Sequence, residues 1–225
     1  MRIYEQIIKP GYLCFDIGAN MGNKSQLMLS LGSKVIAFEP QTQCYDNLVS
    51  RFHNDDNIII EKIALSNYRG ESSIFISNAH TISSMSTEFI GEVKKSRFAS
   101  YNWNEQEPVN TDMLDNMISK YGVPNFIKID VEGYEYEVLT GLSDPDSVNL
   151  VSIEFTPELK HNTKKCMDYL ISIGCDLEFN YSDGETGVFT YENWLDYDSM
   201  WDILSKDESR YTFGDVYIKN KNYSL

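Results

Sequence analysis

The sequence is poor in positive charge, and no run of Lys or Arg is long enough to form a basic stripe. It has 34 Asp and Glu residues against 19 Lys and Arg, which gives a formal net charge of −15. A protein that follows a nucleic-acid backbone needs a basic stripe to neutralise the phosphates. The sequence therefore predicts no nucleic-acid partner, and its excess of acids is typical of a solvated acidic surface.

Long apolar runs and paired cysteines are also missing. No apolar stretch is long enough to cross a bilayer, and residues 1–11 contain no apolar signal core. The 4 cysteines have no metal-like spacing. We interpret them as reduced thiols of a cytoplasmic protein. Without repeats or low-complexity segments, the 225 residues predict a single domain over 1–225, as a monomer or homodimer.

What the sequence does contain is an alternation of short apolar strands and helical segments. Strands are predicted over 12–17, 34–38, 57–65, 71–77, 125–129, 150–155, 176–181 and 213–218, and helices over 2–8, 24–31, 43–52, 112–120, 134–142, 163–173 and 191–205. This order is typical of an α/β fold with a mostly parallel sheet covered by helices on both faces. We expect the last two strands to form a pair, with 213–218 at the edge of the sheet.

Two segments break the alternation. Residues 78–110 are rich in Ser, Thr and Asn and predict a long loop, with Thr111 as the cap of the next helix. A loop of this length in a compact domain is usually a lid or a binding loop. Residues 182–212 form a second variable segment. We expect residues 78–110 to contribute to substrate binding.

The first strand ends in an acid and a glycine turn. Asp16 closes the strand, Gly18-Ala-Asn20-Met-Gly22 forms the turn, and the next strand ends in Glu39 and Pro40. Strand, glycine turn, helix and strand form the first half of a nucleotide-binding unit. The separation of Gly18 and Glu39 is close to the roughly 20 residues at which an acid meets a ribose diol.

Three ligands are compatible with this turn. A dinucleotide requires Gly-x-Gly-x-x-Gly, and Asn20 takes the place of the middle glycine. A P-loop requires glycine before Lys-Ser, but Asn23 precedes Lys24 and Ser25. S-adenosylmethionine (SAM) has no phosphate, and its ammonium and sulfonium groups favour an acid such as Asp16. We favour SAM and keep a P-loop kinase or NTPase as the alternative.

Three further acids are predicted to meet at the carboxyl edge of the sheet. Asp130 and Glu154 end two neighbouring strands, and Glu132 lies two residues beyond Asp130. Converging carboxylates repel one another unless a cation joins them or one stays protonated. They could hold the substrate, act as a general base, bind Mg²⁺, or cap the next helix. His80, in the predicted loop, is a second candidate base.

Six short motifs follow one another between residues 12 and 158. They are Phe15-Asp-Ile-Gly-Ala-Asn-Met-Gly22, Ala37-Phe-Glu-Pro40, Ala64-Leu-Ser66, Thr111-Asp-Met-Leu-Asp115, Phe126-Ile-Lys-Ile-Asp-Val-Glu-Gly-Tyr-Glu135 and Ile153-Glu154. In this order they resemble the motifs of the FkbM family of SAM-dependent methyltransferases. The resemblance implies a Rossmann-like class I methyltransferase fold with a mostly parallel seven-stranded sheet and an antiparallel terminal strand. It also implies O-methylation of a hydroxyl on a carbohydrate, nucleotide-sugar or related small metabolite.

Binding of SAM would give roles to Asp16, Glu39 and the glycine turn between them. Glu39 is expected to bind the ribose hydroxyls and Asp16 the ammonium group, while Asn20 and Ser25 contact the methionyl carboxylate or cap locally. The expected residues for SAM, or its product S-adenosylhomocysteine (SAH), are Asp16, Gly18, Asn20, Gly22, Ser25, Glu39, Pro40, Ala64, Leu65 and Ser66. A protein that binds SAM without catalysis is a further alternative.

Overall fold

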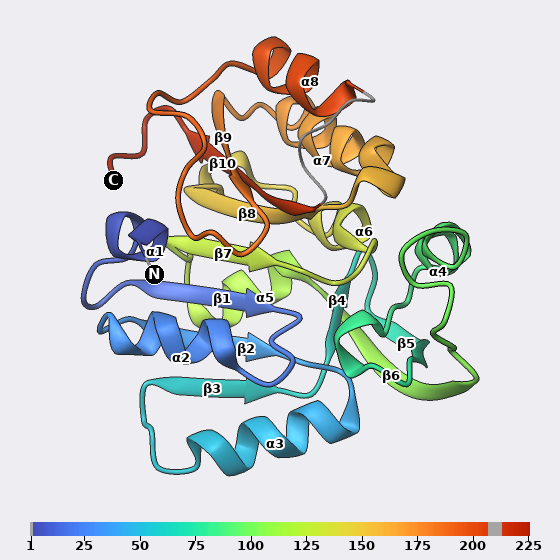
Figure 1. The fold of residues 1–225 in the computed structure, drawn as a ribbon. Helices are drawn as coiled ribbons and strands as arrows, with labels where there is room; N and C mark the ends of the chain where they lie inside the picture. The colour runs from blue at the N-terminus through green and yellow to red at the C-terminus, as the bar shows by residue number, and fades with distance from the viewer. Residues whose placement is uncertain (1, 207–212) are drawn as a thin grey trace.

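The main element of the computed structural model, which describes residues 2–206 and 213–225, is a seven-stranded sheet (Figure 1). Its order is β3-β2-β1-β7-β8-β10-β9. The strands are β1 Leu13–Ile17, β2 Lys34–Phe38, β3 Ile58–Glu61, β7 Phe126–Ile129, β8 Leu150–Phe155, β9 Leu177–Asp183 and β10 Gly214–Asn220. From β3 to β8 the neighbours are parallel, whereas β10 is antiparallel to β8 and β9. The prediction of a mostly parallel sheet with an antiparallel terminal strand is confirmed.

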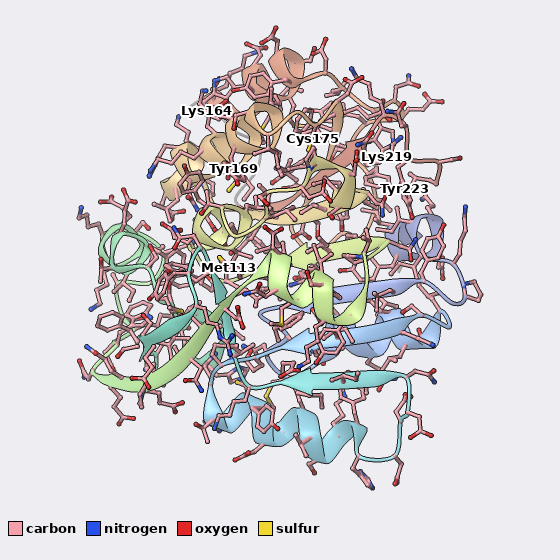
Figure 2. All side chains as sticks on the ribbon, turned by 180° about the vertical axis from the view of Figure 1, so that it is seen from behind. Met113, Lys164, Tyr169, Cys175, Lys219 and Tyr223 are labelled. Carbon is pink, nitrogen blue, oxygen red and sulfur yellow. The ribbon has the colours of Figure 1, made fainter. Side chains whose placement is uncertain are left out.

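Helices cover both faces of this sheet. One face carries α1 Arg2–Ile7, α2 Asn23–Ser30 and α3 Thr42–Phe52, and the other carries α5 Leu114–Tyr121, α6 Glu135–Leu139, α7 Lys160–Ser172 and α8 Tyr197–Ser205. The view from behind shows the second face, with Tyr169 on α7 (Figure 2). Successive strand residues point to opposite faces, so Cys14 packs toward α2 while Phe15 packs toward α5.

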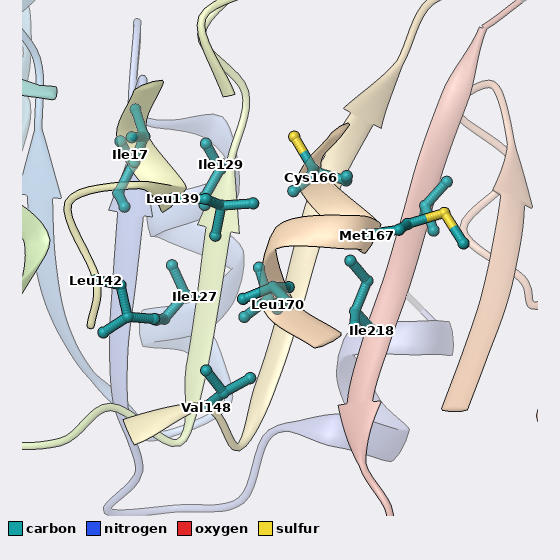
Figure 3. Close-up of a cluster of buried hydrophobic side chains, with 14 of the residues drawn as sticks. Ile17, Ile127, Ile129, Leu139, Leu142, Val148, Cys166, Met167, Leu170 and Ile218 are labelled. Carbon is teal, nitrogen blue, oxygen red and sulfur yellow. The ribbon is translucent and has the colours of Figure 1, made fainter. Parts of the chain in front are cut away.

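The larger hydrophobic cluster lies between the sheet and α5 to α8. Ile127 and Ile129 of β7 pack with Leu139 of α6 and Leu170 of α7, each at most 1% exposed (Figure 3). β-Branched residues on the central strands suit a strand buried on both faces. This packing fixes the direction of the central strands, and therefore the position of their carboxyl ends.

A second, three-stranded sheet lies beyond the carboxyl ends of the parallel strands (Figure 1). It consists of β4 Ala64–Ser66, β6 Glu105–Met113 and β5 Gly70–Ile76, in that order, and α4 Thr87–Val93 lies beside it. Short 3₁₀ helices occupy His80–Ile82, Pro145–Ser147 and Pro157–Leu159. The second sheet therefore forms one wall at the end of the molecule where a ligand binds in folds of this type.

Several predicted boundaries were wrong. The predicted strand 57–65 is two strands in different sheets, separated at Lys62. The predicted loop 78–110 contains α4 and most of β6, which pairs with both β4 and β5. Because one face of β6 is exposed and polar, its sequence shows no run of apolar residues. Thr111 lies within β6 and is not a helix cap.

The end of the chain also differs from the prediction. β10 is not an edge strand, because it lies between β8 and β9 with Val216 and Ile218 fully buried. The predicted helix 191–205 begins only at Tyr197, where Asp196 accepts a hydrogen bond from the Ser199 amide at 2.8 Å. Within the variable segment 182–212, residues 207–212 lie outside the described residues.

The structure also describes the surroundings of the cysteines and the apolar character of the helices. Cys14, Cys44, Cys166 and Cys175 are all unpaired and buried. In the ranges 2–206 and 213–225, no helix has both the length and the apolar character needed to cross a membrane.

A stability prediction follows from the packing of β7. Ile127→Ala is expected to lower the free energy of unfolding by about 2–5 kcal/mol, because it leaves a cavity in the core. Ile59→Ala on β3 is the matched control, since Ile59 is 47% exposed, and should cost less than about 1 kcal/mol. Urea unfolding measures both variants, and equal losses would contradict the assignment of Ile127 to the core.

Candidate active site

A cavity of ≈ 620 Å³ lies at the carboxyl ends of β1, β2, β7 and β8. The second sheet and the connection from β5 to α4 contribute further wall residues. Of the residues predicted from the sequence, the wall contains Asp16, Gly18, Asn20, Glu39, Pro40, Ala64, Leu65, His80, Asp130, Glu132 and Glu154. Gly22, Ser25 and Ser66 are not part of the wall.

Two backbone amides hold Glu39 in the cavity wall. The Asn20 amide donates to Oε2 at 2.7 Å, and the Gln41 amide donates to Oε1 at 2.9 Å. Glu39 is only 2% exposed, and burial raises its pKa to about 7 in spite of these hydrogen bonds. Each carboxylate oxygen keeps a second lone pair. Glu39 can therefore accept two more hydrogen bonds from a ligand with adjacent hydroxyls.

Asp16 ends β1 as a fully buried acid. Its Oδ2 accepts a hydrogen bond from the Ser25 hydroxyl at 2.5 Å, while Oδ1 has no hydrogen-bond donor. Burial raises the pKa of Asp16, and the nearby Lys128 charge and the Ser25 hydroxyl oppose that effect. Ser25 is 0% exposed, so it reaches the cavity only through Asp16.

Lys128 is a site residue that the sequence analysis missed. It lies on β7 in register with Asp16, and its Nζ is 2.8 Å from Asp130 Oδ2 and 4.0 Å from Asp16 Oδ1. Burial acts to lower the pKa of Lys128, but the charges of Asp130 and Asp16 outweigh it and raise the pKa. The sequence feature that could have identified it is a lysine inside an apolar strand, two residues before Asp130.

The structure brings Asp130, Glu132 and Glu154 together, with one oxygen of each within 4.8 Å of the others. Glu132 has a φ of 55°, which is unusual for a residue with a side chain. Burial raises the pKa of both Glu132 and Glu154 well above the ordinary value, and repulsion among the three acids adds to this effect. Oε2 of Glu154 has no hydrogen-bond partner.

His80 fastens the connection between β5 and α4 to the glycine turn. Its carbonyl oxygen accepts hydrogen bonds from Asn20 Nδ2 at 3.2 Å and from Gln41 Nε2 at 3.3 Å. Its imidazole lines the cavity, and Nδ1 is buried without a partner. The backbone amide of Asn20 is bonded to Glu39 and its side-chain Nδ2 to His80. Asn20 therefore stabilises the conformation of the glycine turn.

The two glycines of the turn have different reasons to be glycine. Both have a φ of 79°. A Cβ on Gly18 would lie 1.9 Å from the Asp130 carbonyl oxygen, so the tips of β1 and β7 can approach only without it. A Cβ on Gly22 would collide with Leu48 and Phe52 of α3 at 2.6 Å, so Gly22 serves helix packing.

Ala64 and Leu65 of β4 form part of an apolar wall together with Phe38 and Ile63. Ser66 is not part of this wall; it is 0% exposed and has its hydroxyl 3.1 Å from the Tyr134 hydroxyl.

Arg97 and two phenylalanines complete the wall near the three acids, and no sequence signal identified them. Arg97 lies over the rings of Phe98 and Phe213, at 4.9 Å and 5.9 Å from the ring centroids. Its Nε is 3.4 Å from Glu158 Oε1. Arg97 and Phe98 come from the segment after α4, and Phe213 is the residue before β10, so only the folded chain brings them together at the cavity.

Comparison with known proteins gives a consistent result. The sequence model of a family described as the methyltransferase FkbM domain matches residues 16–210. The chain is 27% identical over 149 residues to a hexuronic acid methyltransferase, AglP, of Haloferax volcanii, covering 62% of this chain and 54% of that protein.

Two solved structures have a similar fold. A methyltransferase FkbM from Methylobacillus flagellatus KT superposes with a TM-score of 0.55 at 14% identity, covering 96% of this chain and 49% of that one. Aeropyrum pernix fibrillarin, in complex with natively bound SAM, has a TM-score of 0.50 at 10% identity, covering 94% and 68%. The chain thus spans about half the length of AglP and of the M. flagellatus protein.

The close approach at Gly18 gives a second stability prediction. Gly18→Ala should destabilise the fold more than Gly11→Ala, although both glycines have a positive φ of 79° and 86°. A Cβ on Gly11 meets nothing within 4 Å, so Gly11→Ala carries only the backbone strain of about 1–2 kcal/mol. Urea unfolding compares the two variants. Equal losses would show that the tips of β1 and β7 separate without cost.

Proposed function

The chain belongs to the FkbM family of methyltransferases, and we propose that it transfers a methyl group from SAM to a hydroxyl of a carbohydrate, nucleotide-sugar or related small metabolite. The fold is that of a class I methyltransferase, with SAM as the methyl donor. The observation that carries the proposal is the pair of strand-end acids, Asp16 and Glu39, beside a cluster of three more acids in one cavity. The name of the curated relative, a hexuronic acid methyltransferase, favours a sugar acceptor.

The residues of the first part of the cavity fit SAM in chemical type. Glu39 has lone pairs for both ribose hydroxyls, in a charge-assisted pair of hydrogen bonds. Asp16 Oδ1 is a buried acceptor without a donor, which an ammonium group would supply. Ala64 and Leu65 offer an apolar surface for adenine, next to Pro40. When bound, SAM supplies an electrophilic methyl group on a cationic sulfur.

The other residues in and next to the glycine turn have structural roles. Asn20 holds Glu39 and is itself held by His80, so we assign it to the shape of the turn. Ser25 orients Asp16, and Gly18 lets the acid tips of β1 and β7 meet. Gly22 belongs to the packing of α2 on α3.

Glu132 and Glu154 are our candidates for the general base. A carboxylate with a raised pKa takes a proton from a hydroxyl more readily near neutral pH than an ordinary one. Both residues line the cavity and have such a pKa, and Glu154 has a free oxygen. Asp130 differs because its charge is shared with Lys128, so we assign it to holding the acceptor. His80 is the second candidate base.

We propose that the reaction needs no metal ion. Three carboxylate oxygens are suitable ligands for Mg²⁺ in chemical type. However, Lys128 already provides Asp130 with a cation at 2.8 Å. Methyl transfer also creates no anionic leaving group for a metal to stabilise, since the sulfur becomes neutral.

The acceptor is proposed to bind where residues of the segment 78–110 enter the wall. Arg97 and Phe98 come from this segment, and Phe213 and Glu185 line the same cavity. Aromatic rings suit the apolar faces of a sugar. We therefore propose that 78–110 is the substrate-binding part of a single domain.

A P-loop kinase is not favoured by the geometry. In a P-loop, Lys24 would bind the phosphates. Its Nζ instead lies 2.8 Å from Glu185 Oε2, in an ion pair. The buried Asp16 would repel a phosphate chain in the same place.

Ligand binding tests the cofactor assignment. SAH is expected to raise the melting temperature, whereas ATP with Mg²⁺ should not. Glu39→Ala should weaken SAH binding by at least about 100-fold, since it removes two hydrogen bonds to a charged group. Calorimetry measures the affinity.

Glu61→Ala is the matched control, because Glu61 also ends a strand of this sheet but bonds to Lys120 outside the cavity. It should bind SAH like the wild type. Undiminished affinity in folded Glu39→Ala would remove the ribose assignment, and stabilisation by ATP alone would favour the kinase.

Methyl transfer to a panel of uronic acids, neutral sugars and nucleotide-sugars tests the reaction. Using SAM labelled in the methyl group, we expect turnover with at least one class. Glu154→Gln should lower turnover by roughly 10²–10⁴-fold without changing the affinity for SAH. Because the base must be ionised, wild-type activity should rise with pH through the raised pKa of Glu154.

The outcomes separate the candidates. His80→Asn is expected to keep most activity, and its selective inactivation would transfer the role of base to His80. Full activity in EDTA is expected, and its loss there would assign a metal to the acids. A protein that binds SAH but turns over no acceptor in the panel would favour a non-catalytic binder.

A further inference from the structure

A buried lysine joins the two parts of the cavity. Lys128 lies at the centre of the sheet and is 3% exposed. Its Nζ is 2.8 Å from Asp130 Oδ2, in the acid cluster, and 4.0 Å from Asp16 Oδ1, at the glycine turn. The parallel register of β1 and β7 places Lys128 directly beside Asp16. The positive charge of Lys128 is therefore shared between Asp16, which we assign to the cofactor, and Asp130, which we assign to the acceptor.

The two acids share this charge unequally. At 2.8 Å the contact with Asp130 is a charge-assisted hydrogen bond, whereas 4.0 Å to Asp16 is too long for one. Asp16 is 0% exposed and receives a single hydrogen bond, from Ser25 to Oδ2. A buried carboxylate oxygen without a donor is costly. Asp16 is part of the cavity wall, and its Oδ1 is buried without a hydrogen-bond partner, so a ligand with N–H donors would complete its surroundings.

The balance of charges also indicates that Asp16 attracts a cationic group. Two carboxylates and one ammonium leave one unit of negative charge at this place. Because Lys128 is engaged by Asp130, the surplus lies on Asp16. Without Lys128, two carboxylates on adjacent strands would have no counter-ion between them, and repulsion would drive one of them to bind a proton. Asp215 on β10 adds a further negative charge near Lys128, which makes removal of the ammonium still less favourable.

We propose that Lys128 is a positioning residue for the cofactor: by engaging Asp130, it fixes the surplus negative charge on Asp16 Oδ1, where the ammonium group of the methionyl chain binds. The inference rests on the proposed function, because it takes Asp16 as the acceptor of that ammonium group. Lys128 acts through Asp16, and the adenosyl part of the cofactor is outside its influence.

A purely structural role for Lys128 makes a different prediction. If Lys128 only neutralised buried acids, its loss would destabilise the fold without changing the preference among ligands. The comparison therefore uses two ligands that share adenosine and a neutral thioether. SAH carries the amino-acid chain, and 5′-methylthioadenosine does not.

Calorimetry of the full chain with both ligands is the experiment. In Lys128→Met, the affinity for SAH should fall roughly 10- to 100-fold, the loss expected for a hydrogen bond to a charged group. The affinity for 5′-methylthioadenosine should not change. Lys164→Met is the control, since Lys164 forms an exposed ion pair with Asp168 on α7 (Figure 2), and it should bind both ligands like the wild type.

A second variant guards against misfolding, because removal of one partner of a buried ion pair is strongly destabilising. Lys128→Met combined with Asp130→Asn removes the pair together and keeps the net charge of the wild type. The single surplus negative charge then lies on Asp16 again, so the folded double variant is expected to recover most of the preference for SAH that Lys128→Met loses. Circular dichroism establishes that each variant is folded.

Four results would overturn the inference. An unchanged ratio of the two affinities in folded Lys128→Met, or a lost preference for SAH in the folded double variant, would limit Lys128 to a structural role. Equal weakening of both ligands would indicate a general change of the cavity. A wild-type protein that binds SAH no more tightly than 5′-methylthioadenosine would remove the role of Asp16. Failure of the wild type to bind either ligand is distinguishable from these, since it would instead reject the proposed function.

Discussion

The contact between the tips of β1 and β7 is the constraint on which the cavity depends. Gly18 allows the Asp130 carbonyl to come within the space that any side chain would fill, and Lys128 then bonds to Asp130 beside Asp16. Two acids from neighbouring strands are thereby kept close in a region with little water. The usual repulsion between them is offset by a cation that belongs to the sheet itself. The position of the acids is thus decided by the same packing that forms the core.

The second sheet explains how a chain of modest length closes a cavity over these acids. β4, β5 and β6 stand beyond the strand ends (Figure 1), and the connection from β5 to α4 contributes residues 80–83 to the cavity wall. The His80 carbonyl attaches this connection to Asn20, and the Ser84 hydroxyl donates to the Glu132 carbonyl at 2.6 Å. Asn20 and Glu132 are the two non-glycine residues with positive φ in the described part of the chain. The covering segment therefore supports the backbone at the two places where it is most strained.

The sequence predicted the parts of the molecule that follow local rules. Apolar runs, helix caps and the Gly18 to Glu39 spacing indicated the parallel sheet, the glycine turn and the acids at the strand ends. It did not predict β6, because a strand such as Glu105–Met113 with one exposed face has no apolar alternation to read. Arg97 and Phe213 could not be found either, since they reach the cavity from segments over 100 residues apart. The sequence shows that Lys128 lies in an apolar strand, but only the register of β7 with β1 shows that it lies beside Asp16.

The place of β10 has a consequence for the order in which the chain folds. β9 bonds to no strand of the main sheet other than β10 in the described residues, although it precedes β10 by the length of α8 and its flanking segments. On a ribosome, the edge of β9 that pairs with β10 would stay unpaired until β10 was synthesised, whereas the other edge can already bond to Thr190 and Leu195. Such non-local pairing is slow to form. The nascent chain consequently exposes one β-strand edge until its partner strand has been made.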